Sequence, residues 1–258
     1  MNIRALFFDI DGTLVGRNHK PSESTLRALQ MSRDNGVLIF VATGRPTDMA
    51  LQLREIFDFD GILCMTGQYA FDRNGNPIYA LSLDKDDIRL MMEIQKTDPF
   101  PCLIVESNDC YTTMQTEFIR EHFARFDLPM PELYDISRID EHDAYQLITY
   151  DPETSNPKLA PLKHIRITNA ATFCHDVIPA LGGKHVGIRA VAAQHGITNP
   201  DEIMVFGDGK NDVDMLTHAG FGVAMGNACP EAKAAADYIT DDVDEDGIFN
   251  ALKHFGVI

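Results

Sequence analysis

Continuous apolar runs alternate with amphipathic stretches at the start of this chain of 258 residues. The runs ALFF at residues 5–8 and VLIFVAT at 37–43 are typical of parallel strands covered on both faces. Residues 21–36 carry cap-type serines at their beginning and a glycine at their end, which predicts a helix. A second helix is expected after the sequence TGRP, where apolar residues recur at helical spacing up to Phe57, before a further apolar run at 61–65. This order predicts a doubly wound parallel α/β sheet.

The pattern changes beyond the third strand. Asn74 and Gly75 lie between two runs of β-forming residues, which is a strong signal for a β-hairpin. Helical stretches then alternate with strands; we expect helices at 84–96 and 117–126 and strands at 102–107, 145–150 and 164–169. Ile119, Phe123 and Phe126 share one face of the second of these helices. The segment 151–161 is rich in proline and polar residues, so a surface loop is expected there.

The α/β rhythm returns after Gly182 and Gly183. The expected elements are helices at 184–195, 211–219, 230–236 and 247–255 and strands at 203–208 and 221–225. The sequence thus predicts a discontinuous, Rossmann-like core domain built from residues 1–83 and 184–258. Residues 84–183 form an inserted α+β domain in this prediction.

Composition and charge exclude several classes of protein. With 45% hydrophobic residues the chain can bury a large core, and a net charge of −17 argues against nucleic-acid or anionic-membrane partners. No apolar run approaches the roughly 20 residues of a membrane helix, and the beginning of the chain lacks a signal-peptide layout. The five cysteines are scattered and lack metal-site spacing. We expect a cytoplasmic protein with reduced thiols.

Polar residues follow the ends of the predicted parallel strands. Ligands bind beyond the carboxyl ends of strands in such sheets, so these residues are expected to meet at one edge. The candidates are Asp9, Asp11, Gly12, Thr13, Thr43, Gly44, Arg45, Gly207, Asp208, Gly209, Asn211 and Asp212. Lys184 begins the first helix after the insert.

Several aspartates at one sheet edge would repel each other, which implies a divalent cation. Oxygen ligands without histidine or cysteine favour Mg²⁺, which commonly also takes phosphate oxygens of a substrate as ligands. Lys184, Thr43 and the backbone amides beside Thr43, at Gly44, could then hold a phosphoryl group. Asp9 could attack phosphorus, while Asp11 protonates the leaving alcohol and then deprotonates a water.

Four segments resemble the ordered motifs of the haloacid dehalogenase-like superfamily: DIDGT at 9–13, ATGR at 42–45, Lys184 and GDGKND at 207–212. The insert resembles the type-two cap of that superfamily, and the end of the chain resembles the Cof-type sugar-phosphate phosphatases. The resemblance implies that Asp9 is the nucleophile and Asp11 the acid and base. It implies that Asp9, the backbone carbonyl of Asp11 and Asp208 hold Mg²⁺, with Asp212 supporting or ligating the metal, and that Thr43, Lys184 and Asn211 hold the phosphoryl group.

Some positions leave alternatives open. Family members often have Asn-Gly-Ala after the third strand, whereas this chain has Thr66, Gly67 and Gln68. Lys210 competes with Lys184 for the lysine role, and Asp212 could simply cap a helix. Arg45 is more often a surface or inter-element charge in such a position, so it is left out of the predicted site.

The leading hypothesis is a Mg²⁺-dependent phosphatase that hydrolyses small phosphorylated metabolites, most plausibly hexose or pentose phosphates. A lid of about 100 residues over the site would exclude macromolecules and bulk water. A sugar phosphomutase and a non-catalytic sugar-phosphate sensor are the alternatives. Candidate substrate contacts in the cap are Arg89, Arg120, Arg125, Lys158 and Lys163. No pattern in the sequence predicts an oligomeric state.

Overall fold

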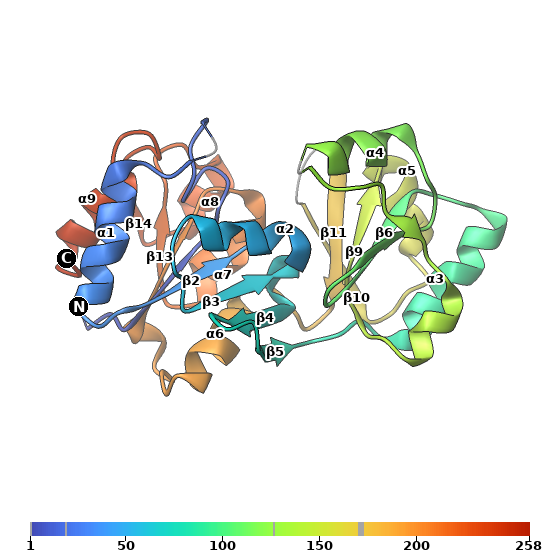
Figure 1. Ribbon diagram of the computed structural model, residues 1–258, viewed down its shortest axis with the longest axis horizontal. Helices are drawn as coiled ribbons and strands as arrows, with labels where there is room; N and C mark the ends of the chain where they lie inside the picture. The colour runs from blue at the N-terminus through green and yellow to red at the C-terminus, as the bar shows by residue number, and fades with distance from the viewer. Residues whose placement is uncertain (1, 19, 126, 170–172) are drawn as a thin grey trace.

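Two β-sheets organise the molecule (Figure 1). The computed structural model describes residues 2–18, 20–125, 127–169 and 173–258. One sheet has eight strands in the order β14-β13-β12-β1-β2-β3-β4-β5, and the other has six in the order β10-β11-β9-β6-β7-β8. The chain passes to the second sheet between Ala80 and Lys85 and returns between Pro179 and Lys184. The predicted insert, 84–183, begins and ends within these two crossings.

The eight-stranded sheet is mainly parallel. Its parallel strands are β1 (Ala5–Phe8), β2 (Leu38–Ala42), β3 (Gly61–Cys64), β12 (Ile203–Gly207), β13 (Phe221–Ala224) and β14 (Tyr238–Ile239). The predicted hairpin is confirmed as antiparallel β4 (Tyr69–Asp72) and β5 (Pro77–Ala80), with Gly75 at φ +90°. The helices of this part are α1 (Glu23–Asp34), α2 (Thr47–Leu51), α6 (Lys184–Gln194), α7 (Val213–His218), α8 (Pro230–Ala235) and α9 (Gly247–His254).

The central position of β1 explains its continuous apolar sequence. All four residues of β1 are buried, and the strand pairs with β12 on one side and β2 on the other. Phe7 stacks on Phe40 at 4.7 Å between ring centroids, and Phe8 stacks on Phe206 at 4.8 Å. Successive side chains of a strand point to opposite faces, so both faces of the sheet are covered, as the sequence predicts.

The six-stranded sheet is largely antiparallel. It consists of β6 (Cys102–Glu106), β7 (Cys110–Thr112), β8 (Glu132–Leu133), β9 (Ala144–Tyr150), β10 (Ile165–Asn169) and β11 (Cys174–Pro179). Its helices are α3 (Lys85–Thr97), α4 (Glu117–Ala124) and α5 (Pro152–Ser155). Neighbouring residues of β6 and β9 belong to two different hydrophobic clusters. Ile104 and Leu147 pack in one cluster with Met91 of α3, whereas Leu103 and Ile148 belong to the cluster of the parallel sheet.

Several predicted elements differ from the structure. The helix after TGRP ends at Leu51 and continues only as a 3₁₀ turn, Gln52–Glu55. The segment expected to be a loop at 151–161 contains α5 and a 3₁₀ turn, Asn156–Leu159. Strands β7, β8, β11 and β14 were not predicted, because they are short or mix polar residues with apolar ones. Phe126, assigned to a packed helix face, lies outside the described residues. Within the described part of the chain, no helix combines the length and apolar character needed to span a membrane.

Candidate active site

The carboxyl end of β1 lies in the middle of the parallel sheet and presents two aspartates. Asp9 is 7% exposed, and its backbone N–H donates to the carbonyl of Phe206 in β12 at 2.9 Å. Gly12 adopts φ +86°, a left-handed conformation that favours glycine and turns the chain after the two acids. A Cβ on Gly12 would lie 2.3 Å from a carboxylate oxygen of Asp208. The tight turn therefore brings the loop after β1 against the loop after β12.

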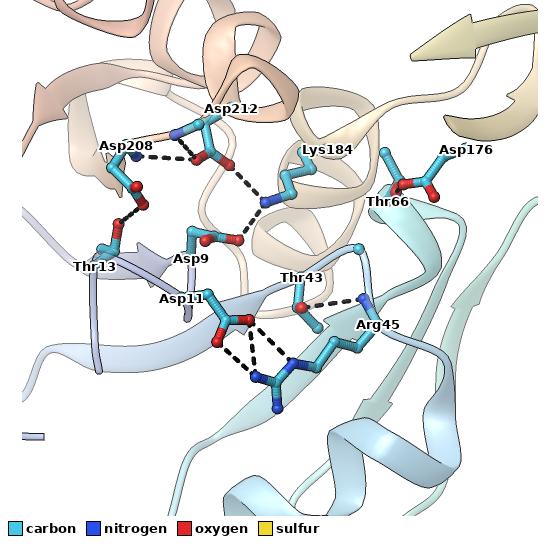
Figure 2. A network of polar contacts seen from close by, with 12 residues as sticks. Asp9, Asp11, Thr13, Thr43, Arg45, Thr66, Asp176, Lys184, Asp208 and Asp212 are labelled. Atoms are coloured by element: carbon cyan, nitrogen blue, oxygen red, sulfur yellow. Dashed lines mark hydrogen bonds and ion pairs between the residues drawn. The ribbon is translucent and has the colours of Figure 1, made fainter. Parts of the chain in front are cut away.

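Lys184 is fully buried between two carboxylates. Its Nζ donates to Asp9 Oδ1 at 2.6 Å and to Asp212 Oδ1 at 2.6 Å (Figure 2). Lys210, the competing lysine, forms a half-exposed ion pair with Glu231 at 2.7 Å. The structure thus places Lys184, and not Lys210, beside the predicted nucleophile.

Asp208 and Asp212 complete an acidic cluster after β12. Thr13 Oγ1 donates to Asp208 Oδ1 at 2.8 Å, and Asp212 Oδ2 accepts the backbone N–H groups of Asp208 at 3.0 Å and Gly209 at 2.9 Å. Asp212 therefore caps its turn, as one of its two interpretations holds, and also binds Lys184; its role at a metal stays a prediction. Asp9, Asp208 and Asp212 each place an oxygen within 4.8 Å of the other two.

The acidic cluster is short of positive charge. Burial, with the neighbouring Asp212 and Asp208 carboxylates, raises the pKa of Asp9 to about 8 although Lys184 opposes the shift. Burial is also the main cause that raises the pKa of Asp208 to about 6. Burial opposes the charge of Lys184, but Asp212 and Asp9 together raise its pKa above the ordinary value. One ammonium group does not neutralise three carboxylates, so the site favours an additional cation.

Arg45, which the sequence analysis leaves out of the site, lines the cavity and pairs with Asp11. Its Nη2 donates to Asp11 Oδ1 at 2.7 Å and to Oδ2 at 2.8 Å, and its Nε donates to Oδ2 at 3.2 Å (Figure 2). The backbone N–H of Arg45 also donates to Thr43 Oγ1 at 3.1 Å. The sequence signal for this contact is that Arg45 lies just after β2, where ligand-binding residues are expected. The Asp11 carboxylate turns toward Arg45. The predicted contact between the backbone carbonyl of Asp11 and a metal stays a prediction.

A cavity of about 320 Å³ lies over these residues. On the side of the parallel sheet its lining includes the predicted site residues Asp9, Asp11, Thr43, Gly44, Asp208 and Asn211. The inserted unit contributes Leu103, His122, Ile148, Cys174 and Asp176. The sequence predicted none of these five as substrate contacts, because their strand positions do not reveal which face meets the core.

The predicted cap cations do not line this cavity among the described residues. Arg89 pairs with Asp140 at 2.6 Å, and Lys158 pairs with Asp98 at 2.6 Å. Arg120 lies 3.5 Å from Glu117, and Arg125 lines a separate, wider groove. Beside its apolar contacts with the core, the cap makes polar ones: Thr66 Oγ1 donates to Asp176 Oδ2, and Gln146 Nε2 donates to Thr66 Oγ1 at 3.2 Å.

The fold and the acidic cluster define an α/β protein with an inserted cap, and comparison with known proteins identifies its family. Residues 6–252 match the haloacid dehalogenase-like hydrolases, so the chain belongs to that family. It is 29% identical, over 99% of this chain and 96% of the relative, to 5-amino-6-(5-phospho-D-ribitylamino)uracil phosphatase YcsE of Bacillus subtilis.

Two solved structures are also similar over nearly the whole chain. BT1666 of Bacteroides thetaiotaomicron is described as a phosphatase of this superfamily; it shares 32% identity with a TM-score of 0.88, over 99% of this chain and 96% of that one. The subclass IIB sugar phosphatase BT4131 shares 33% identity with a TM-score of 0.86, over 99% and 100%. The present protein is accordingly a phosphatase, an enzyme that hydrolyses phosphoric monoesters.

Proposed function

We propose that this phosphatase hydrolyses small phosphorylated metabolites, foremost sugar phosphates, with Mg²⁺ and through an aspartyl-phosphate intermediate on Asp9. The observation that carries the proposal is the buried contact of Lys184 with Asp9 and Asp212 at the carboxyl ends of the central strands. This contact supports the proposal because the carboxylate assigned as nucleophile lines the cavity and has a fixed positive charge beside it.

The side chains fit a magnesium ion. Asp9, Asp208 and Asp212 offer only oxygen donors, close enough together to serve one ion, and burial has raised the pKa of Asp9 and Asp208. Bound Mg²⁺ would supply the positive charge that keeps these carboxylates ionised at neutral pH and would draw negative charge from the phosphoryl oxygens.

The remaining steps belong to the side chains of the chain itself. A carboxylate oxygen of Asp9 attacks phosphorus, and the bond from phosphorus to the alcohol oxygen breaks. Asp11 gives its proton to that oxygen, so the alcohol leaves neutral. Asp11 then takes a proton from a water molecule whose oxygen attacks the same phosphorus, which releases phosphate and restores Asp9. Lys184 and the Thr43 hydroxyl are proposed to hold phosphoryl oxygens meanwhile, with the Asn211 amide.

The inserted unit, residues 84–183, is proposed to act as a cap domain that limits the substrate to small molecules. Its residues form one wall of a cavity of about 320 Å³, the volume of a metabolite and not of a macromolecule. The names of two relatives, a sugar phosphatase and a phosphoribitylamino-uracil phosphatase, both describe small phosphate esters with polyhydroxylated parts. We propose the same class here.

To test this proposal, purified protein is incubated with a panel of sugar phosphates and assayed for free phosphate, once with added Mg²⁺ and once with EDTA in place of Mg²⁺. We expect release of phosphate only with Mg²⁺. Asp9→Asn should abolish turnover while substrate binding persists, whereas Asp34→Asn, at the exposed end of α1, should behave as wild type. Isomeric sugar phosphate without free phosphate would favour a phosphomutase. Tight binding by the wild-type protein without turnover would favour a sensor.

A further inference from the structure

The inserted unit places one buried carboxylate in the wall of the active-site cavity. Asp176, in β11, is 3% exposed and lines the cavity. Its Oδ2 accepts a hydrogen bond from Thr66, which follows β3 of the parallel sheet, and Figure 2 shows these two side chains next to each other. The pair joins the two sheets at the point where substrate must sit.

Asp176 lies beside the loop that is proposed to bind the phosphoryl group. A Cβ on Gly44 would lie 3.3 Å from Asp176 Oδ2, 3.3 Å from Thr66 Oγ1 and 4.0 Å from Asn211 Nδ2. A carboxylate cannot serve as a ligand for anionic phosphoryl oxygens, because like charges repel each other. It can accept a hydrogen bond from the part of the substrate that leaves as the alcohol.

The rest of the cap wall is apolar or neutral. Leu103, Ile148 and Cys174 present carbon and sulfur atoms to the cavity. His122 Nδ1 lies 2.6 Å from the Tyr150 hydroxyl, and burial lowers the pKa of this imidazole, with Arg125 contributing. Among the residues described, the cap lines the cavity with no lysine or arginine. A second anionic group on the substrate would therefore meet the Asp176 carboxylate without a cation from the cap to balance it.

We propose that Asp176 selects the leaving group, so that the substrates are monophosphates whose alcohol part donates a hydrogen bond from a hydroxyl or ammonium group, and bisphosphates and phosphorylated sugar acids are rejected. This inference rests on the proposed phosphatase function and adds a substrate class to it. Thr66 acts as a positioning residue, because its hydroxyl holds one carboxylate oxygen in place.

Matched substrate pairs test the assignment. We expect kcat/KM for glucose 6-phosphate to exceed that for 6-phosphogluconate, and kcat/KM for fructose 6-phosphate to exceed that for fructose 1,6-bisphosphate, each by about 10- to 100-fold, the usual range for a hydrogen bond to a charged group. Glucosamine 6-phosphate separates the two donors: a higher kcat/KM than for glucose 6-phosphate assigns ammonium, and a lower one assigns hydroxyl.

Variants then connect the selectivity to the residue. Asp176→Asn removes the charge at constant size, and we expect it to narrow both selectivity ratios about tenfold or more. Thr66→Val removes only the hydroxyl and should narrow them less, with KM rising more than kcat falls. Asp98→Asn, a cap aspartate that pairs with Lys158 away from the cavity, should leave both ratios as in wild type.

Two results would overturn the assignment, and they are distinguishable from failure of the proposed function. The first is a wild-type preference for bisphosphates or sugar acids while p-nitrophenyl phosphate is still hydrolysed. The second is an Asp176→Asn protein that unfolds cooperatively, as a folded protein does, and whose two selectivity ratios match those of wild type. If no phosphate ester is hydrolysed, p-nitrophenyl phosphate included, the phosphatase proposal itself fails and this inference fails with it.

Discussion

Replacement of Lys184 by methionine removes one charge and keeps most of the length of the side chain. The lysine is fully buried and binds Asp9 and Asp212 at 2.6 Å each, so the variant leaves two buried carboxylates without their shared partner. Loss of one partner from a buried ion pair costs about 3–5 kcal/mol. At roughly 2–4 °C per kcal/mol for a chain of this size, the melting temperature should fall by about 6–20 °C.

The loss should depend on pH in a defined direction. The pKa of Asp9 is already raised to about 8, and without Lys184 it should rise further. A carboxyl group whose pKa is higher in the folded protein than in the unfolded chain destabilises the fold as pH rises, because the unfolded chain gives up the proton more readily. Lys184→Met should therefore be more destabilised at pH 9 than at pH 6.

Thermal unfolding in EDTA, followed by circular dichroism at both pH values, measures this effect. Lys210→Met is the matched control, because Lys210 forms only a half-exposed ion pair with Glu231. We expect the control to melt as wild type does. A Lys184→Met protein that melts together with the control at pH 9 would refute the argument that this lysine neutralises the buried acids.

Three further perturbations follow from the site. Arg45→Met frees the Asp11 carboxylate, and kcat for sugar phosphates should fall roughly tenfold or more, whereas p-nitrophenyl phosphate, whose phenol leaves without a proton, should lose less; equal losses would refute a positioning role. Gly12→Ala forces a Cβ to 2.3 Å from Asp208, so phosphatase activity should largely disappear, as steady-state assays would show. Asp176→Asn should raise the melting temperature at pH 8 but not at pH 4. Burial raises the pKa of Asp176 from 3.8 to about 6, so ionisation of this carboxyl group destabilises the folded wild-type protein as pH rises from about 4 to 6. The variant avoids this loss, which amounts to up to about 3 kcal/mol at pH 8.

Gly36→Ala is the control for the glycine substitution. Gly36 also has a positive φ, +81°, but a Cβ there meets no atom within 4 Å. Gly36→Ala should therefore show how much stability is lost when alanine adopts a positive φ, without any clash at the site. Full activity in both alanine variants would contradict the close approach of Gly12 to Asp208.

The parallel strands were predictable because burial on both faces leaves a continuous apolar sequence, as in β1 and β2. Strand β11 was not predictable, because His175 and Asp176 interrupt its apolar pattern in the part of the strand that lines the cavity. Short edge strands such as β8 and β14 contain two residues each, too few for any periodicity. Sequence patterns therefore reveal the layers of this fold better than their edges.

A similar division applies to the site. The rule that ligands bind at strand ends identifies Asp9 and Asp208, because each directly follows a recognisable strand. It says nothing about partners that meet only in three dimensions. Arg45 and Asp11 are 34 positions apart, and Thr66 and Asp176 are 110 apart. The first pair has no local pattern, and the second depends on a strand that was not predicted.

The neighbours of β1 have a consequence for synthesis of the protein. Ala5 pairs with Ile203, so the central strand waits for 198 further residues before one of its two edges is covered. At translation rates of about 5–20 residues per second, this delay lasts roughly 10–40 s. The continuous insert can complete its own sheet earlier, on the ribosome. We expect the edge of β1 to stay unpaired through this interval, with the cap strands complete only for the 24 residues between Pro179 and Ile203, which makes the interval the stage most dependent on chaperones.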